Sequence, residues 1–320
     1  MLKTKIILIL FLSFINKTVF ANEINKLVFP KAEILNKYTA RIPFKLIDHL
    51  IVVEANLLNK KGNFIIDTGS QNLILNKVHF PSQYEHNKKR VETTGVLNSL
   101  DNPLQKKISE FNLLHFSLKD KNSDIIDLSH IEKIKKMHLL GIIGYSILKD
   151  YEIFIDLYLN QITLTKVDKN GNKLDPKVYL EEIVDSINFN LKKHTIVVNG
   201  VINNQKLKLG LDTAAEFNQI NKSVNKKVLK HFVPKKRINL AGASNKQVEV
   251  LAGNLHRLKL SETVYLGPMK TFLINLPKMH EVFGVQLDGI LGYEFFKYKR
   301  TIINYQKEKL YFINYPLNNQ

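Results

Sequence analysis

Short apolar runs separated by polar clusters dominate the chain. The runs are rich in β-branched and aromatic residues and are bounded by glycine, asparagine, aspartate and lysine, a pattern typical of β-strands. Only two segments, 128–138 and 221–232, combine helical apolar spacing with good helix formers. The pattern therefore predicts an all-β protein with a few short helices. The clearest predicted strands cover 51–53, 64–66, 153–155 and 161–165.

An internal repeat organises these elements into two copies. Matching residues in the first block share a separation of 145 positions (212 − 67), and those in a second block a separation of 148 (289 − 141). The change of register indicates a small net insertion in the middle of the second copy. A similarity held over two long blocks favours a tandem duplication. The matches include 42–46 with 187–191, His49 with His194, 51–53 with 196–198, Asp67-Thr68 with Asp212-Thr213, and 141–145 with 289–293.

The repeat and the polar segments between its copies suggest domain boundaries. A turn-rich stretch, Asp168-Lys169-Asn170-Gly171-Asn172, closes the first copy and forms the natural connection. We divide the chain into a signal peptide (1–21), a short N-terminal segment (22–39), a first lobe (40–167), an inter-lobe connection (168–184) and a second lobe (185–320).

The first residues have the pattern of a secretory signal. Lys3 and Lys5 precede an apolar run at 6–15, and Val19-Phe20-Ala21 offers a small-residue cleavage site. A buried N-terminal strand or an uncleaved anchor is the alternative interpretation. Cleavage would leave a secreted or periplasmic protein without an integral membrane span, because the apolar run is too short to cross a bilayer.

Composition excludes several classes of function. Hydrophobic residues make up 44% and charged residues 24%, the balance of a globular protein. The absence of cysteine excludes disulfides, thiolate metal sites and cysteine nucleophiles. None of the histidines, His130 and His138 among them, falls in a zinc-binding spacing, so we interpret them as surface or helix residues. We expect no metal and no other cofactor.

A net charge of +18 invites comparison with nucleic-acid-binding proteins. However, only five of the 47 basic residues are arginines, and lysine is the ordinary solvated charge rather than the forked ligand of phosphates and bases. The basic residues are also spread along the chain, so we expect no nucleic-acid partner. The arginines are Arg41, Arg90, Arg237, Arg257 and Arg300.

The strongest chemical signal is a pair of aspartates. In each copy an apolar strand runs directly into one, at Asp67 and at Asp212. A single instance would indicate an Asx-turn that ends a strand. Two instances at matching positions of a duplication predict that a pseudo-twofold axis brings the carboxyl groups together.

Two facing carboxylates have a definite chemistry. At 4 Å they repel by roughly 4 kcal/mol at an effective dielectric of about 20, so one holds a proton while the other acts as a base. The charged group can take a proton from a water that attacks a carbonyl, and the protonated group can donate to the carbonyl oxygen. The pair therefore predicts acid–base hydrolysis of a peptide bond without a metal or a covalent intermediate.

At this point the chain resembles the aspartic proteases of the pepsin/retropepsin superfamily. The resemblance lies in Asp67-Thr68-Gly69-Ser70 and in two apolar-apolar-glycine segments, which contain Ile143-Gly144 and Leu291-Gly292. It covers both copies. It implies a bilobal acid-protease fold of two homologous β-barrel-like lobes with an active-site cleft between them, and a monomeric endopeptidase that acts on peptides or proteins.

The resemblance also implies roles for single residues. Asp67 and Asp212 would be catalytic, and Thr68 and Thr213 would brace the lobes through backbone hydrogen bonds. Gly69 would let backbone N–H groups approach the carboxylates, and the Ser70 hydroxyl would bond to one of them. The second copy departs from this pattern, because Ala214 and Ala215 replace the glycine and the serine.

Aspartic proteases cover their cleft with a hairpin flap. The candidates here are two similar loops, one in each copy, and neither carries the tyrosine of pepsin-like flaps. Two such loops resemble the retroviral arrangement fused into one chain. The flap candidates are Thr94, Gly95 and Val96 in the first copy, and Gly242, Ala243 and Ser244 in the second.

A rival hypothesis is a protein with the same fold that does not hydrolyse peptide bonds. Ala214 and Ala215 would suit a non-catalytic descendant that binds peptides or another protein. A more remote alternative, prompted by the net charge, is a basic module that binds polyanions.

Overall fold

The protein is described from a computed structural model of the whole chain. The described residues are 6–7, 11–13, 27–57, 59–80, 93–94, 99–100, 104–113, 116–178, 181–242, 247–275 and 285–315. They form a mostly-β structure with few short helices, as predicted, built on one closed six-stranded barrel and one curled half-barrel sheet. The four strands predicted most clearly lie within β6 (Leu50–Leu57), β7 (Lys60–Ile66), β14 (Tyr151–Asp156) and β15 (Gln161–Lys166).

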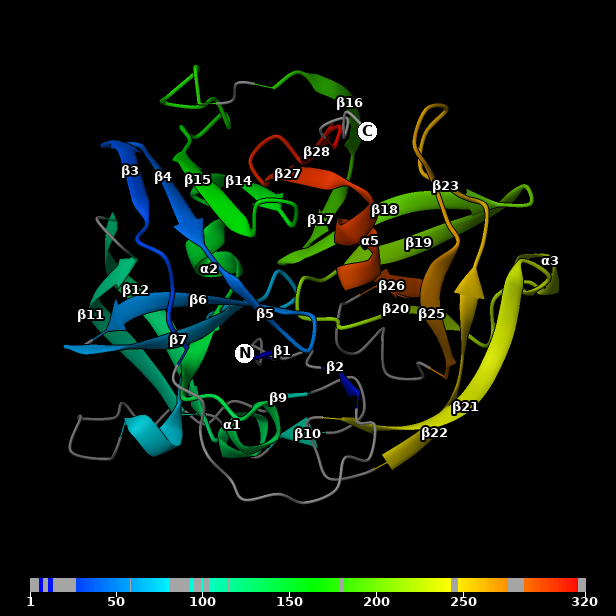
Figure 1. Cartoon of the computed structure of the whole chain (residues 1–320), viewed down its shortest axis with the longest axis horizontal. Helices are drawn as coiled ribbons and strands as arrows, with labels where there is room; N and C mark the ends of the chain where they lie inside the picture. Colours follow the sequence, from blue (N-terminus) through cyan, green and yellow to red (C-terminus); the bar gives the residue numbers. More distant parts are fainter. Residues whose placement is uncertain are drawn as a thin grey trace, which may run out of the picture.

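The first copy forms the closed barrel, on the left of Figure 1. Its sheet runs in the order β11-β12-β8-β13-β7-β6-β5, and a second pairing, Phe111 with Leu57, joins β11 to β6 and closes the ring. The strands are β5 (Lys45–Ile47), β6 (Leu50–Leu57), β7 (Lys60–Ile66), β8 (Leu73–Asn76), β11 (Leu104–Leu113), β12 (Phe116–Ile126) and β13 (Leu139–Ile143).

The second copy forms the curled half-barrel, on the right of Figure 1. Its strands follow the same order, with β25, β20, β26, β19 and β18 standing where the first copy has β12, β8, β13, β7 and β6. The strands are β17 (Asn190–Lys192), β18 (Thr195–Ile202), β19 (Gln205–Leu211), β20 (Asn218–Asn221), β21 (Phe232–Gly242), β22 (Gln247–Leu255), β23 (Leu258–Lys259), β24 (Tyr265–Leu266), β25 (Met269–Ile274) and β26 (Gly289–Leu291).

The two sheets also share their pairing register. Val52 faces Ile65 in the first sheet, and Val197 faces Gly210 at the matching position of the second. The parallel pairs in front of the aspartates match as well, with Ile143 beside Ile66 and Leu291 beside Leu211. Because a one-residue slip would turn every side chain to the other face, equal registers give both copies the same inward-facing positions.

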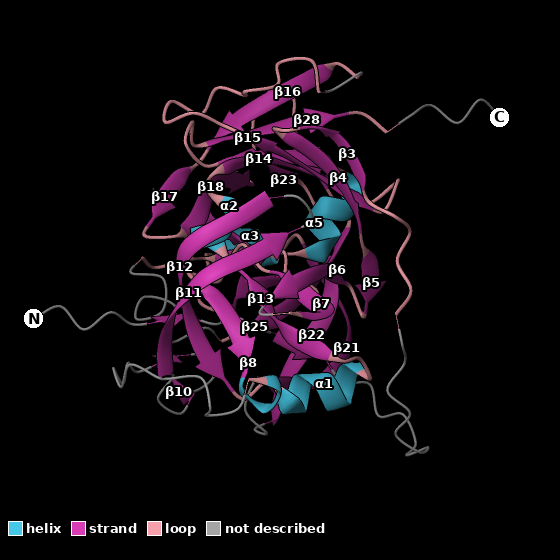
Figure 2. Ribbon diagram, turned by 90° about the vertical axis from the view of Figure 1, so that its left-hand side faces the viewer, coloured by secondary structure: helices cyan, strands magenta, loops and turns pink. Residues whose placement is uncertain are grey.

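A third sheet joins the copies, at the top of Figures 1 and 2. At its centre Phe154 of β14 faces Ile302 of β27, and these two residues are repeat counterparts. A residue that faces its own counterpart marks the pseudo-twofold axis. The sheet runs β16 (Ile183–Asn188), β28 (Lys309–Ile313), β27 (Arg300–Asn304), β14 (Tyr151–Asp156), β15 (Gln161–Lys166), β4 (Thr39–Pro43) and β3 (Glu33–Asn36).

The main hydrophobic core follows the same path through the molecule. One cluster of buried apolar side chains includes Phe64 of the first barrel, Ile153 and Ile303 of the joining sheet, and Leu209 of the half-barrel. The two copies are therefore held together by shared apolar burial as well as by strand pairing.

The helices are short, and one helix prediction is largely wrong. In 128–138, α1 covers Ser129–Lys135 and ends at Lys136, which is left-handed with φ 50°. In 221–232, Asn221 belongs to β20, and only α3 (Lys226–Leu229) is helical. Residues 222–224 and 230–231 form turns and bends, and Phe232 begins β21. The other helices are a 3₁₀ turn, η1 (Lys77–His79), α2 (Tyr145–Leu148) and α5 (Tyr293–Tyr298). Within the described ranges we find no helix with the length and apolarity needed to span a membrane.

Two short strands near the start of the chain meet the segments predicted as flaps. β1 (Ile6–Ile7) pairs in parallel with β9 (Thr93–Thr94), which also pairs with β10 (Ser99–Leu100). β2 (Phe11–Ser13) pairs with the end of β21, where Phe11 faces Gly242. Thr94 and Gly242 thus lie at strand ends, whereas Gly95, Val96, Ala243 and Ser244 lie outside the described residues. Signal cleavage stays a prediction.

Candidate active site

The two aspartates occupy equivalent turns at the ends of β7 and β19. The N–H of Asp67 donates to the carbonyl of Ile143 (3.0 Å), and the N–H of Asp212 donates to the carbonyl of Leu291 (2.9 Å). Each turn is therefore fixed by the apolar-apolar-glycine strand of its own copy. Both aspartates are buried, with 0% and 2% exposure.

Gly144 and Gly292 allow those strands to approach the turns. A Cβ at Gly144 would lie 2.7 Å from the carbonyl oxygen of Ser70, and one at Gly292 would lie 2.1 Å from that of Ala215. Any side chain would collide with backbone there. The same carbonyls accept the next N–H groups, from Tyr145 (2.8 Å) and Tyr293 (2.9 Å). Close approach explains the glycine at both positions.

Backbone donors hold one oxygen of each carboxyl group. Oδ1 of Asp67 accepts from the N–H groups of Gly69 (2.8 Å) and Ser70 (3.1 Å), and Oδ1 of Asp212 accepts from Ala214 (2.8 Å). The Ser70 hydroxyl does not take part, because it donates to the carbonyl of Asn72 (3.4 Å). Ser70 thus donates its backbone N–H to Asp67, and its hydroxyl does not make the bond to the carboxylate that the resemblance implies. Replacement of the serine by Ala215 therefore removes no side-chain hydrogen bond to Asp212.

The second oxygen of each carboxyl group lacks such a donor among the described residues. Oδ2 of Asp67 and Oδ2 of Asp212 are buried and accept no hydrogen bond from a described donor. Burial, followed by the charge of Asp212, raises the pKa of Asp67. Burial also raises the pKa of Asp212, against backbone hydrogen bonds that lower it. The two groups interact directly, so the pair retains a proton at a pH where isolated carboxyls would both be ionised.

The two threonines connect the turns across the axis. The N–H of Thr68 donates to Oγ1 of Thr213 (3.0 Å), and the N–H of Thr213 donates to Oγ1 of Thr68 (3.0 Å). The Thr68 hydroxyl in turn donates to the carbonyl of Leu211 (3.2 Å), and the Thr213 hydroxyl to that of Ile66 (2.8 Å). Four buried, reciprocal hydrogen bonds fix the distance between the turns, and with it the separation of the carboxyl groups.

Gly69 and Ala214 differ in the space around them. A Cβ at Gly69 would lie 2.8 Å from Oδ2 of Asp212, so a methyl group there would displace the carboxyl. Ala214 does carry a methyl group. It is fully buried and packs with Ile65 and Ile142 of the first copy. The second turn therefore accommodates its alanine by burying the methyl group in the core of the opposite copy.

Two histidines reach across to the opposite turn, and sequence reasoning missed them. Nε2 of His194 lies 3.2 Å from the carbonyl of Gly69, and Nδ1 of His49 lies 3.2 Å from that of Glu216. His194 is buried, which lowers its pKa to about 4. His49 stacks on Tyr293 with ring centroids 4.2 Å apart. The available signal was the repeat itself, because these two residues are counterparts within it.

A buried ion pair supports the second turn from the first copy. Nζ of Lys135, on α1, lies 2.6 Å from Oε1 of Glu216, four residues after Asp212. Both side chains are buried, and the lysine also contacts Asp48 at 3.2 Å. Helix α1 is thereby connected to the loop that carries Asp212. The residues lie far apart in the sequence, and no local pattern indicates their contact.

The sequence matches no protein-family model, and it matches no curated protein sequence.

Proposed function

We propose that this protein is an aspartic endopeptidase with the bilobal acid-protease fold, in which Asp67 and Asp212 hydrolyse a peptide bond. One observation carries the proposal: two buried carboxyl groups lie at equivalent turns, close enough for the charge of Asp212 to raise the pKa of Asp67, and each has one oxygen held by backbone N–H groups while the other accepts no hydrogen bond from a described donor. Buried titratable pairs with raised pKa values are typical of catalytic sites.

The proposed reaction follows from sharing one proton. The ionised carboxyl takes a proton from a water molecule as the water oxygen attacks the carbonyl carbon of the substrate. The protonated carboxyl donates its proton to the carbonyl oxygen, which gives a neutral tetrahedral diol. The carboxyl group that took up the water proton then gives it to the amide nitrogen, while the other carboxylate accepts a proton from a diol hydroxyl. The C–N bond breaks, an acid and an amine are released, and the pair again holds one proton. The hydrogen bonds between Thr68 and Thr213 keep the acid and the base in register throughout.

The second copy supports catalysis as well as the first. Since the Ser70 hydroxyl donates to Asn72, replacement by Ala215 costs the Asp212 turn no carboxylate hydrogen bond. Ala214 still donates its N–H to Asp212 at 2.8 Å, as Gly69 does to Asp67. These observations favour the enzyme over the non-catalytic peptide-binding protein, for which the two alanines were the motive.

A cleavage assay tests the proposal. Purified protein is incubated with a mixed peptide library between acid and neutral pH, with and without pepstatin, and products are identified by mass spectrometry. We expect cleavage in the wild type and its loss in Asp67→Asn and in Asp212→Asn, which keep the shape and remove the ionisation. Asp150→Asn, an exposed aspartate paired with Lys121, is the control and retains activity.

The outcomes separate the two hypotheses. Cleavage that persists in either active-site variant, with both variants folded by near-ultraviolet circular dichroism, contradicts the enzyme. Saturable peptide binding without turnover in the wild type supports the binding protein. Because burial raises both pKa values, we expect the active, singly protonated pair to persist to higher pH than isolated carboxyls would allow.

A further inference from the structure

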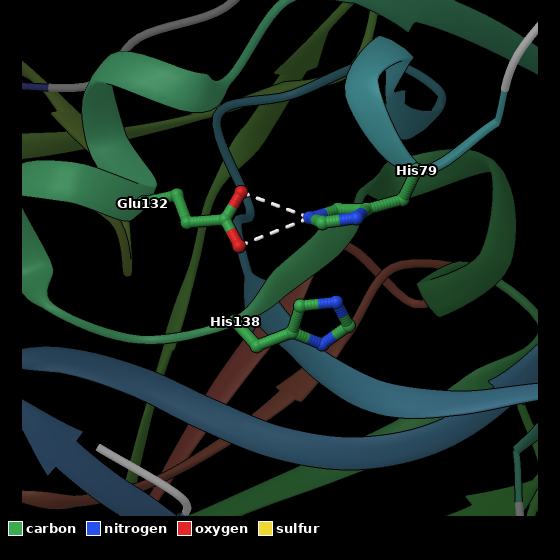
Figure 3. A group of neighbouring side chains, drawn as sticks. All are labelled: His79, Glu132 and His138. Atoms are coloured by element: carbon green, nitrogen blue, oxygen red, sulfur yellow. Dashed lines mark hydrogen bonds and ion pairs between the residues drawn. The ribbon is translucent and has the colours of Figure 1, made fainter. Parts of the chain in front are cut away.

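A second group of titratable side chains lies in the first copy and plays no part in the proposed hydrolysis. It comprises His79 at the end of η1, Glu132 on α1 and His138 just before β13. One ligand atom from each residue lies within 4.8 Å of the others. Figure 3 shows the Glu132 carboxylate directed at the His79 ring, with the His138 ring beside both.

The carboxylate at the centre of this group is buried and fixed. Glu132 is 6% exposed, and both its oxygens lie close to Nε2 of His79, at 3.0 and 2.9 Å. Asn76 Nδ2 donates to Oε2 (3.1 Å), and the N–H of Leu139 donates to Oε1 (3.3 Å). Such outer hydrogen bonds orient the carboxylate ligands of metal sites.

The two histidines are held by their backbones and differ in exposure. The carbonyl of His138 accepts from Asn63 (2.7 Å), and that of His79 accepts from the Lys60 ammonium. The rings stand with their centroids 4.2 Å apart. His79 is partly buried, whereas His138 is exposed, so an ion could enter from solvent on its side.

We propose that His79, Glu132 and His138 bind a divalent transition-metal ion, with Zn²⁺ as the fitting occupant. Two imidazoles and a carboxylate are one of the ligand sets that Zn²⁺ adopts in proteins. Ligand atoms bound to Zn²⁺ at about 2.0–2.2 Å in a tetrahedral arrangement lie about 3.4 Å apart. The His79–Glu132 contact must open by a fraction of an ångström, and the ion then replaces the proton between them. Water takes the position left toward solvent.

A bound ion would connect three elements of the first copy. It would join η1, α1 and the start of β13, and α1 also carries Lys135 to the loop after Asp212. The ion would act as a structural clamp on this helix. One charge opposes it, since the Lys60 ammonium lies near enough to act on His138.

Metal titration tests the site directly. Protein stripped with a chelator is titrated with Zn²⁺ by calorimetry, and with Co²⁺ by visible absorption, which reports the ligand geometry. We expect one ion per chain, and a melting temperature that rises with Zn²⁺. The informative variant is His138→Gln, because this exposed ring can be lost without disturbing the buried carboxylate. We expect its affinity to fall about 10–100-fold.

Further variants make the result unambiguous. His79→Gln should weaken binding as strongly as His138→Gln does, because each variant removes one of the two imidazole ligands. His130→Gln is the matched control, because His130 lies on α1 with Glu132 but does not belong to the cluster. The proposal is wrong if the wild type binds no Zn²⁺ at millimolar concentration, or if His138→Gln and His79→Gln bind it as the wild type does. Peptide cleavage is not a readout here, so the two proposals fail independently.

Discussion

The two copies agree at the aspartate turns and differ where the barrel closes. In the first copy β11 is one uninterrupted strand that pairs with both β12 and β6. In the second, the equivalent path is broken at Arg257, whose φ of 60° is left-handed, and only the short strand β23 returns to meet Val201 of β18. The turns at Asp67 and Asp212 nevertheless share the backbone bond to the apolar-apolar-glycine strand and the N–H donor two residues after the aspartate, and the first turn adds a second donor from Ser70. A duplicated sheet can therefore change on its outer side while the strands behind the carboxyl groups keep their register.

The copies also differ in the side chains that each one extends to the aspartate turn of the other copy. The first copy sends α1 with Lys135 to the second turn, and each copy sends one histidine. The methyl group of Ala214 has a buried place, whereas one at Gly69 would not. The two copies are thus symmetric at the aspartate turns and asymmetric in the side chains that contact those turns. Substitutions at these positions measure how far this asymmetry extends.

The largest effect should come from the one-sided ion pair. Lys135→Met removes the buried cation that lies 2.6 Å from the Glu216 carboxylate, which we expect to lower the free energy of unfolding by about 3–5 kcal/mol. Urea denaturation at neutral pH measures it. The double variant Lys135→Met/Glu216→Gln removes both charges and should recover at least half of the loss. A single variant as stable as the wild type would contradict the role given to this pair.

The next effect should distinguish Gly69 from Ala214. Gly69→Ala places a methyl group against the Asp212 carboxyl, and we expect about 1–3 kcal/mol of destabilisation together with loss of peptide cleavage. The matched change, Ala214→Gly, removes one buried methyl group and should cost about 1 kcal/mol with cleavage retained. Thermal unfolding and the cleavage assay give the comparison. Equal behaviour of the two variants would show that the turns have the same space after all.

A pH-dependent effect should separate the two histidines. Burial lowers the pKa of His194 to about 4, so between pH 6.5 and 4 the unfolded chain binds a proton that the folded protein does not. The wild type loses stability over this window. His194→Gln should lose about 1–3 kcal/mol less between neutral pH and pH 4.5, measured by urea unfolding at both.

His49→Gln is the comparison for that experiment. The pKa of His49 is also lowered by burial, but this residue is only half-buried, so the change in slope should be smaller. A His194→Gln protein with the same pH dependence as the wild type would contradict the assignment.

The smallest effect should come from the serine that the second copy lacks. Because the Ser70 hydroxyl donates to the carbonyl of Asn72 over a long 3.4 Å rather than to Asp67, Ser70→Ala should lower the free energy of unfolding by no more than about 1 kcal/mol. Cleavage should stay within about twofold of the wild type. A large loss of activity would show that the hydroxyl turns toward the carboxylate during the reaction.

The sequence predicted those features that depend on the internal repeat or on a local strand pattern. The strands around Ile51, Phe64 and Ile153 have alternating or continuous apolar runs, and they form as expected. The duplication predicted that Asp67 and Asp212 would come together, because equivalent residues approach each other across an axis. The segment 221–232 was misjudged because its two ends are fixed in strands, Asn221 beside Ile274 and Phe232 beside Leu255, which leaves space for only a short helix between them.

The sequence did not predict contacts between residues that are far apart in the chain and are not counterparts in the repeat. His79 is 53 residues from Glu132, and their contact depends on how η1 and α1 pack rather than on a local spacing. The Lys135–Glu216 pair spans 81 residues and joins different copies. The break at Arg257 is equally hidden, because arginine carries no preference for left-handed backbone. Such features follow from tertiary packing, and only coordinates reveal them.

The Phe154–Ile302 pairing has a consequence for how chains of this kind assemble. The edge that β14 offers to β27 lies on a rotation axis, so β27 of another molecule fits it as well as the strand of its own chain does. Refolding at high concentration can therefore exchange halves between molecules. The resulting intertwined dimer would still contain two complete pairs of aspartates, and its mass would be twice that of a single chain.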